Sequence, residues 1–219
     1  MNDQLILKFP SSKIYKKEDF YVSSSNQTAF DYINSWPKWI KRIVNIFGPS
    51  GSGKSHLASL LKNKTSCLEV DSLKLNNETI SRFKTKEALI IENLNQNVSE
   101  KYLFNLWNAA TQDNKYLLIT SNKAINTYKF KLKDLTSRIN SSLIIGINLP
   151  SDDLISVILA KNFSDKQIKV EKKHIDYIIK RIDRSYEKIS QFILTLDKYS
   201  LKKGSPFALK MIKEVLKMV

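Results

Sequence analysis

The sequence is poor in cysteine, glycine and arginine, and it has no long hydrophobic run. Cys67 is the only cysteine among 219 residues, so no disulfide can form within the chain, and we expect a reducing cytoplasmic compartment. The longest apolar runs, such as 88–91 and 143–145, fall far short of the roughly 20 residues that a membrane-spanning helix needs. Asp3 and Gln4 stand where a secretory signal carries basic residues. We therefore expect neither a secreted domain nor a membrane partner.

The charge is strongly positive, with 36 Lys and Arg against 21 Asp and Glu and a net charge of +15. Such an excess of cations favours contact with nucleic-acid phosphates. Only five of the cations are arginines, however, and lysine is abundant together with isoleucine and asparagine, as expected from AT-rich codon usage. A solvated lysine-rich surface is therefore the preferred interpretation over a DNA groove, and direct DNA contact stays open.

The remaining composition is that of a globular protein, with 42% hydrophobic and 26% charged residues. Short apolar or β-branched runs alternate with longer helical patterns, which predicts an α/β fold whose five parallel strands are covered by helices. The predicted strands span residues 43–47, 67–70, 88–91, 116–120 and 143–147. Helices are expected at 53–62, 99–112 and 131–139. This α/β nucleotide-binding domain is assigned to residues 11–149.

The pattern changes after residue 147, because no further strand run follows. Pro150-Ser151-Asp152 is typical of a helix start. Residues 150–219 are predicted to form a small all-helical lid domain, with helices near 152–163, 171–181, 185–199 and 206–217.

The most specific motif is a phosphate-binding loop. It matches G-x-x-x-x-G-K-S and lies between a predicted strand and a predicted helix, which is the structural context that such a loop requires. Glycines allow backbone N–H groups to face phosphate oxygens, the lysine reaches the outer phosphates, and the final serine binds Mg²⁺. Three of the five glycines in the chain fall here. The nucleotide-binding residues are Gly48, Pro49, Ser50, Gly51, Ser52, Gly53, Lys54 and Ser55.

Polar residues at the ends of two later strands are candidates for the same site. Glu92 ends the run 88–91 and is expected to hold Mg²⁺ together with Ser55, although a surface carboxylate is the alternative interpretation. The next residue, Asn93, stands where many ATPases carry a carboxylate that activates water, and an amide cannot accept that proton. Asn122 follows the strand 116–120, where a polar side chain is expected to face the γ-phosphate. We expect slow intrinsic hydrolysis.

Several blocks, in order, resemble the DnaA/Hda family of AAA+ P-loop ATPases. Residues 19–27 look like the adenine-pocket segment of that family, and the phosphate loop is followed by the same His-Leu pair. The motif 118–122 is similar to the first sensor strand, and 134–138 to the block that bears the arginine finger. The resemblance covers nearly the whole chain and implies that ATP or ADP also contacts Phe20, Val22, Asn26 and His56.

The resemblance also implies roles for two arginines. Arg138 matches an arginine finger, which reaches across a subunit interface to a phosphate on a neighbouring molecule; without the resemblance it would as easily be a helix-surface arginine. The second sensor of the family is an arginine whose register falls here on Glu187. Arg184, one turn earlier, is therefore the candidate for nucleotide contact in the helical domain.

The chain begins with a segment similar to the sliding-clamp-binding peptide at the start of Hda proteins. It follows the pattern Q-x-x-L-x-[LF] within residues 1–10. Gln4 would hydrogen-bond at the rim of the clamp pocket, while Leu7 and Phe9 would supply apolar anchors. Leu5, which lies between Gln4 and Leu7, belongs to the same partner-binding peptide. An ordinary first strand is the alternative interpretation.

Three functions are compatible with these features. The preferred one, implied by the resemblance, is a regulator that is tethered to the DNA polymerase sliding clamp and promotes hydrolysis of DnaA-bound ATP through Arg138. A helicase loader of the DnaC type would lack the clamp peptide. A small-molecule kinase would use a similar phosphate loop but generally several arginines in a lid. A homo-oligomer is also left open.

Overall fold

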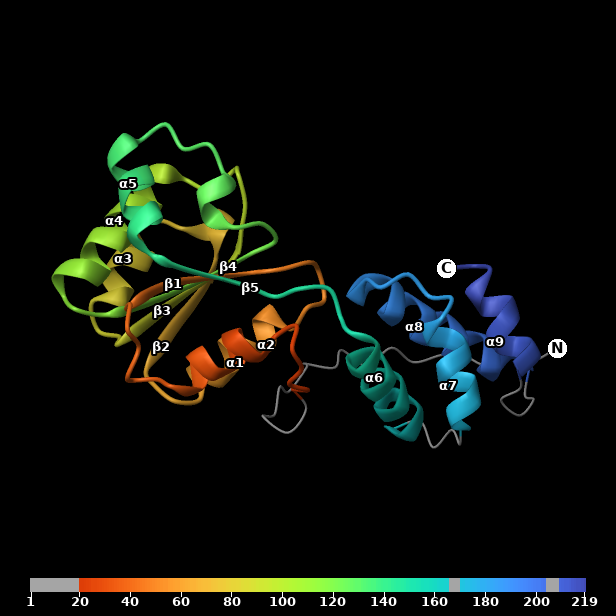
Figure 1. Ribbon diagram of the computed structural model, residues 1–219. Helices are drawn as coiled ribbons and strands as arrows, with labels where there is room; N and C mark the ends of the chain where they lie inside the picture. The colour runs from red at the N-terminus through yellow and green to blue at the C-terminus, as the bar shows by residue number, and fades with distance from the viewer. Residues whose placement is uncertain (1–19, 166–169, 204–208) are drawn as a thin grey trace.

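The computed structural model describes residues 20–165, 170–203 and 209–219. Its centre is a five-stranded parallel sheet in the order β2-β3-β4-β1-β5 (Figure 1). The strands are β1 (Ile43–Phe47), β2 (Cys67–Asp71), β3 (Ala88–Leu94), β4 (Tyr116–Ser121) and β5 (Leu143–Gly146). The predicted α/β fold with five parallel strands is confirmed, and the predicted strand bounds agree to within three residues.

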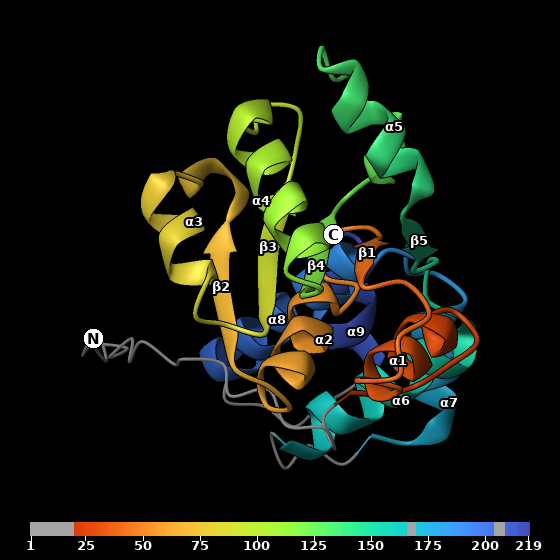
Figure 2. The same ribbon diagram turned by 90° about the vertical axis from the view of Figure 1, so that its left-hand side faces the viewer.

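Helices cover both faces of the sheet (Figure 2). The helices α1 (Gln27–Asn34) and α2 (Lys54–Lys62) lie on one face. The helices α3 (Asn77–Phe83), α4 (Glu100–Gln112) and α5 (Lys133–Ser141) lie on the other. Successive residues of a strand point to opposite faces. Ala88 and Ile90 of β3 accordingly join the core with α2, while Leu89 and Ile91 join the core with α4. Burial on both faces explains why the strands are continuous apolar runs.

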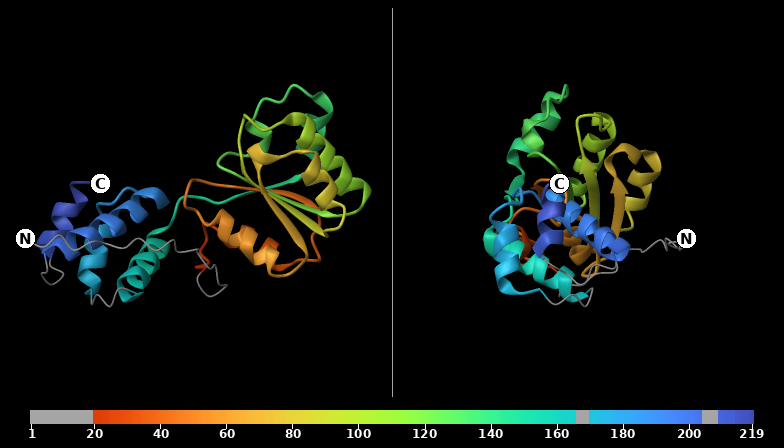
Figure 3. Two further views of the ribbon diagram at one scale, coloured as in Figure 1. Left: turned by 180° about the vertical axis from the view of Figure 1, so that it is seen from behind. Right: turned by 90° about the vertical axis from the view of Figure 1, so that its right-hand side faces the viewer.

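The C-terminal part consists of four helices with a separate core. They are α6 (Asp152–Asp165), α7 (Lys172–Ile179), α8 (Tyr186–Lys203) and α9 (Leu209–Leu216). Their apolar stripes meet around Phe192, Ile178 and Ile212, which are fully buried. Figure 3 shows this group set beside the sheet, to which the segment after β5 connects it. The Ser151 hydroxyl caps α6 by accepting a hydrogen bond from the Leu154 N–H at 3.3 Å.

Two helices were not predicted. The helix α1 begins at the last residue of the segment 19–27, which is identified by the family resemblance, and α3 follows a short polar stretch. The latter is begun by a capping box, in which the side chain of Asn76 accepts from the Thr79 N–H at 2.9 Å. Both helices have eight residues or fewer, and neither lies in a longer stretch of apolar periodicity as α7 does. Across the described ranges, no helix is long and apolar enough to span a bilayer.

Candidate functional site

The phosphate loop connects β1 to α2 and takes a left-handed backbone at two glycines. Gly51 has φ +79° and Gly53 has φ +90°, values that residues with a Cβ atom rarely adopt. Gly53 is also the N-cap of α2 and has no side chain with which to cap it. The first N–H groups of the helix therefore remain available to an anion, and the helix dipole adds positive potential at the same place.

Lys54 is the first residue of α2 and is buried, with only 8% of its surface exposed. Its Nζ donates to the backbone oxygens of Gly48 at 2.7 Å and Pro49 at 2.9 Å, so the side chain is folded back onto the loop. Burial lowers the pKa of the ammonium, and the nearby carboxylate of Glu92 partly opposes that shift. The arrangement places one cation inside the loop, where phosphate oxygens would replace the two carbonyls as its partners.

Ser55 and Glu92 meet at the edge of the loop, as the sequence predicts. The Ser55 hydroxyl donates to the Glu92 carboxylate, while Glu92 Oε1 is buried and has no hydrogen-bond partner among the described residues. Burial raises the pKa of Glu92, and the carboxylates of Glu69 and Asp71 raise it further. A bound cation would stabilise the charged form of Glu92 against its burial and against the negative charges of Glu69 and Asp71.

A hydroxyl and a carboxylate are ligands that suit Mg²⁺. Within the described ranges, no group of three or more His, Cys, Asp or Glu residues could hold a metal ion by itself. Mg²⁺ at Ser55 and Glu92 would therefore take its other ligands from phosphate oxygens and water, as it commonly does in nucleotide sites. Ser55 and Glu92 therefore suit Mg²⁺ when phosphate oxygens and water complete its coordination.

Asn93 adopts a left-handed backbone, with φ +57°, at an irregularity in the pairing of β3 with β4. Its Nδ2 donates to Asp71 Oδ2 at 3.0 Å, and its backbone N–H donates to Thr120 Oγ1 at 3.2 Å. The hydrogen bond from Asn93 is the largest of the effects that lower the pKa of Asp71. The amide is therefore engaged with β2 and supplies no base next to Glu92.

The end of β4 is attached directly to the phosphate loop. The Gly48 N–H donates to the Ser121 oxygen at 3.1 Å, and Asn45 Nδ2 donates to Ser121 Oγ at 2.9 Å. Asn122 follows Ser121 and is exposed. Asn122 thus follows β4 at the same sheet edge as Lys54, Ser55 and Glu92, and its contact with the γ-phosphate stays a prediction.

A cavity of about 150 Å³ adjoins the phosphate loop. It lies between the first described segment of the chain, the loop and the helical domain. The ring of Phe20 stacks on Phe30 at 5.4 Å and meets His56 edge-on at 5.2 Å. The lining includes three of the four residues that the family resemblance implies, Phe20, Asn26 and His56, together with Tyr21, Leu154, Ile158 and Tyr186.

The fourth of those residues, Val22, does not line this cavity and is 38% exposed. Asn26 shapes the segment itself, because its Oδ1 accepts from the Ser23 N–H at 2.8 Å and its Nδ2 donates to the Tyr21 oxygen at 2.8 Å. Arg184 pairs with Asp152 of α6 at 3.1 Å, is exposed, and does not line the cavity either.

Tyr186 is a residue of this site that sequence analysis did not identify. It begins α8, and a Cβ atom placed on Gly51 would lie 3.1 Å from the Tyr186 Cβ. Its hydroxyl donates to the Asn148 oxygen at 3.3 Å and shares a 3.5 Å hydrogen bond with the Ser25 hydroxyl. Tyr186 therefore joins the helical domain to the loop, and no sequence pattern signals a contact over 161 residues.

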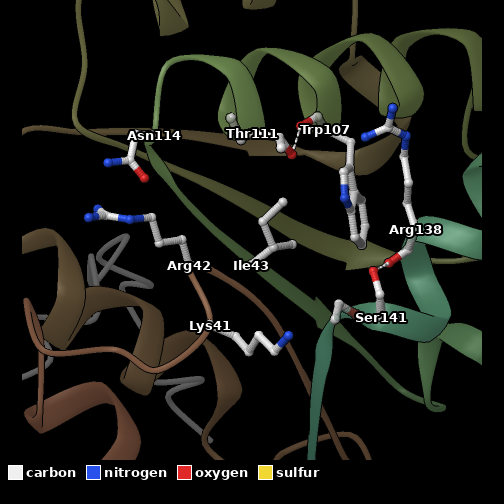
Figure 4. Close-up of a pocket in the computed structure, with 10 residues that line it drawn as sticks. Lys41, Arg42, Ile43, Trp107, Thr111, Asn114, Arg138 and Ser141 are labelled. Atoms are coloured by element: carbon white, nitrogen blue, oxygen red, sulfur yellow. Dashed lines mark hydrogen bonds between the residues drawn. The ribbon is translucent and has the colours of Figure 1, made fainter.

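Arg138 lies at the opposite end of the sheet from the phosphate loop. It belongs to α5, which ends just before β5, and it lines a second cavity with Ile43, the first residue of β1 (Figure 4). The phosphate loop follows Phe47, the last residue of β1, about 16 Å further along the strand. An arginine side chain does not span that distance. Arg138 is thus placed away from the nucleotide site of its own chain, whereas Gln4, Leu5, Leu7 and Phe9 lie outside the described residues.

No family model matches the chain. Among curated proteins, it is 26% identical to the chromosomal replication initiator protein DnaA of Borrelia turicatae over 93% of this chain and 48% of that protein. It is 23% identical to DnaA of Lactiplantibacillus plantarum over 93% of this chain and 50% of that protein. The chain therefore spans about half the length of the curated relatives that it matches.

Solved structures of DnaA proteins and of a RuvB variant share the fold of this chain. Domain III of the Thermotoga maritima replication initiation protein DnaA aligns with a TM-score of 0.76 and 18% identity, covering 93% of this chain and 95% of that one. AMPPCP-bound DnaA from Aquifex aeolicus aligns with a TM-score of 0.71 and 20% identity over 87% of this chain and 67% of that one. A RuvB variant from Thermotoga maritima reaches 0.71 at 12% identity, covering 90% and 70%. The chain has the fold of these structures, that of the AAA+ P-loop module, and it is similar in sequence to the DnaA replication initiators over about half of their length.

Proposed function

We propose that the protein is a regulator of replication initiation of the Hda type, which binds adenine nucleotide and promotes hydrolysis of ATP held by DnaA. ATP or ADP would lie with its phosphates on the loop 48–55, with Mg²⁺ at Ser55 and Glu92. Its base would enter the cavity lined by Phe20, Asn26 and Tyr186. Support for a resident nucleotide comes from the buried Lys54 and the uncapped start of α2. AMPPCP in the similar DnaA from Aquifex aeolicus is consistent with it.

The position of Arg138 is the observation that carries the regulatory proposal. A cation that stabilises charge during phosphoryl transfer must contact the phosphate oxygens. Because Arg138 lies at the far end of β1 from the loop of its own chain, it acts in this proposal on a nucleotide of another molecule. The homology to DnaA makes a DnaA module the partner that we propose.

Tethering to the sliding clamp is the second part of the proposal, and it depends on the sequence of residues 4–9. The clamp would keep the regulator on replicated DNA, so that hydrolysis is promoted only after replication has begun. Asn93 fits a protein that does little hydrolysis itself, since its amide is bound to Asp71 and cannot accept a proton from water.

The test uses DnaA loaded with labelled ATP and freed of excess nucleotide. The wild-type chain is added with clamp-loaded DNA, with DNA alone, or with neither, and the bound label is followed as ADP. Fast conversion only when chain and loaded clamp are both present is the expected result. Conversion at the rate of DnaA alone in every mixture would show that the proposed function is wrong.

A further inference from the structure

The helical domain carries a cluster of cations on α7 and α9. These two helices lie next to each other at the end of the domain away from the sheet (Figures 1 and 3). Lys210 and Lys213 of α9 and Lys217, immediately after α9, are exposed. Their spacing of three and four residues places them on one helix face. Lys180 and Arg181, at the end of α7, are also exposed. Together these five residues form the α7/α9 cation face.

Tyr177 connects the two helices within this face. Its ring lies under the guanidinium of Arg181, whose central carbon is 3.8 Å from the ring centre. Lys213 Nζ lies 5.8 Å from the same centre, so the ring holds one cation from each helix. Arg181 also donates to the Tyr177 backbone oxygen at 3.4 Å. Because a guanidinium has five N–H donors, Arg181 is ordered by these contacts and keeps donors for a further partner.

Few carboxylates neutralise the α7/α9 cation face. At the start of α7, Glu171 pairs with Lys173 at 2.5 Å, outside the five cations. Glu214 of α9 accepts a hydrogen bond from a tyrosine of α8. Asp176 and Asp183, the two other carboxylates of α7 and the turn after it, are exposed. In the part of the helical domain that the structure describes, no ion pair engages any of the five cations. The face therefore keeps an excess of positive charge.

We propose that the α7/α9 cation face binds the phosphate backbone of duplex DNA without regard to base sequence. The sequence leaves contact with DNA open because its cations are spread along the chain, whereas the fold brings five of them together. Lysine and arginine release counterions from DNA phosphates, which supplies most of the affinity in such contacts. Contacts to phosphates carry no sequence information directly. The inference goes beyond the proposed function and does not depend on it, because it concerns another surface and another partner.

A membrane surface fits this face less well than DNA. A helix that lies in a membrane interface turns an apolar face toward the lipid. The apolar residues of α9 point the other way, since Met211, Ile212 and Val215 are buried in the core of the helical domain. Met218, which follows α9, is exposed, but one apolar side chain is not an apolar face. Protein–DNA interfaces, in contrast, are polar and strongly positive, as this face is.

A single strand also fits this face less well than a duplex. Proteins that bind single strands without sequence preference stack successive bases on aromatic side chains. Tyr177 is the aromatic residue of this face, and its ring is half-buried and covered by Arg181. The ring is therefore occupied by a cation instead of offering a surface to bases. A duplex, whose bases are stacked on one another, needs only contacts to its phosphates.

The test measures the anisotropy of a short fluorescent duplex against the concentration of the full chain, at several salt concentrations and without DnaA or clamp. The triple variant Lys210→Gln, Lys213→Gln, Lys217→Gln removes the lysines of α9 while it keeps helix propensity. At low salt we expect it to bind at least about tenfold more weakly, because its phosphate contacts are lost. The slope of log affinity against log salt should become shallower by about 1 for each lysine removed. Two duplexes of unrelated sequence should bind alike.

The matched control is the triple variant Lys38→Gln, Lys74→Gln, Lys84→Gln. It removes the same charge from exposed positions of the α/β domain and should bind the duplex nearly as wild type does. Unfolding midpoints and ADP binding by both triple variants establish that the fold is intact. Lys180→Gln gives a second measurement on α7, where the salt slope should fall by about 1. It decides the matter if the α9 variant has a lowered midpoint.

Three results would overturn the proposal. Equal losses of affinity in the two triple variants would mean that binding follows the total charge of the chain. Tighter binding of a single strand than of the duplex would mean that bases are contacted. Wild-type affinity of the α9 variant for the duplex, with loss of binding to vesicles of phosphatidylcholine and phosphatidylserine, would mean that the face contacts a membrane. The stimulation of ATP hydrolysis by DnaA is measured separately, so either proposal can fail while the other stands.

Discussion

At the residue scale, the proposed binding of nucleotide depends on Lys54. Its ammonium is the cation inside the loop, and phosphate oxygens would replace the two backbone oxygens that it now contacts. Lys54→Ala should therefore bind fluorescent ADP at least about a hundredfold more weakly, because a charge-assisted contact is lost at a buried position. Lys62→Ala removes an exposed lysine from the same helix and should bind as wild type does. Equal affinity of the Lys54→Ala protein would refute the assignment of the loop.

Cys67 gives a second test at this scale. Burial raises the pKa of its thiol from 9.0 to about 11, so at pH 8 the thiolate is on the order of one molecule in a thousand. Iodoacetamide should modify the native protein far more slowly than the urea-unfolded chain, and the native rate should rise with pH until about 11. A native rate equal to that of the unfolded chain would show that the thiol is not shielded as the structure indicates.

The raised pKa of Cys67 also determines the direction in which the free energy of unfolding changes with pH. The unfolded thiol loses its proton near pH 9.0, whereas the folded thiol keeps it until about 11. The folded state therefore binds more protons in that interval, and the free energy of unfolding falls as the pH rises from about 9 to about 11. Below about pH 9 the Cys67 thiol is protonated in both the folded and the unfolded state, so it gives the free energy of unfolding no dependence on pH.

At the scale of elements, α8 is attached to the phosphate loop through Tyr186. Tyr186→Phe removes two long hydrogen bonds and should lower the free energy of unfolding by about 1 kcal/mol. Tyr186→Ala also removes a buried ring beside Gly51 and should cost about 3 kcal/mol and weaken ADP binding. Urea unfolding and ADP titration measure both effects. Wild-type behaviour of the alanine variant would mean that the helical domain is not anchored at the loop.

Sequence alone predicts the elements whose pattern is local. Buried parallel strands are apolar runs, so all five were found, and the loop 48–55 has a motif that depends on neighbouring residues only. The helices α1 and α3 are missed, whereas α7, which is equally short, is predicted because its apolar stripe of Ile175, Ile178, Ile179 and Ile182 continues past the end of the helix. The contact of Tyr186 with Ser25 joins distant parts of the chain. No local pattern encodes such contacts.

At the scale of the whole molecule, the candidate nucleotide site and Arg138 lie at opposite ends of one sheet, and a clamp peptide is proposed at residues 4–9. The double variant Gln4→Ala, Leu7→Ala should lose binding to purified sliding clamp and keep the wild-type unfolding midpoint. We expect this loss because the double variant removes both the hydrogen bond at the pocket rim and one apolar anchor. Asp31→Ala, at an exposed position of α1, serves as the control for clamp binding. A large drop in the midpoint would instead favour a first strand packed on the domain.

In the proposed function, Arg138 acts on a nucleotide held by another molecule. This action is measured as conversion of labelled ATP bound to DnaA, with clamp-loaded DNA and either the wild-type, Arg138→Ala or Arg138→Lys protein. Arginine fingers contribute roughly 10³ to 10⁵ in rate in other NTPases. We expect Arg138→Ala to keep its fold, its ADP binding and its clamp binding but to lose the stimulation of conversion, and we expect lysine to restore little because an ammonium lacks the planar fork. Conversion at the wild-type rate with Arg138→Ala would show that Arg138 does not act on the nucleotide of DnaA.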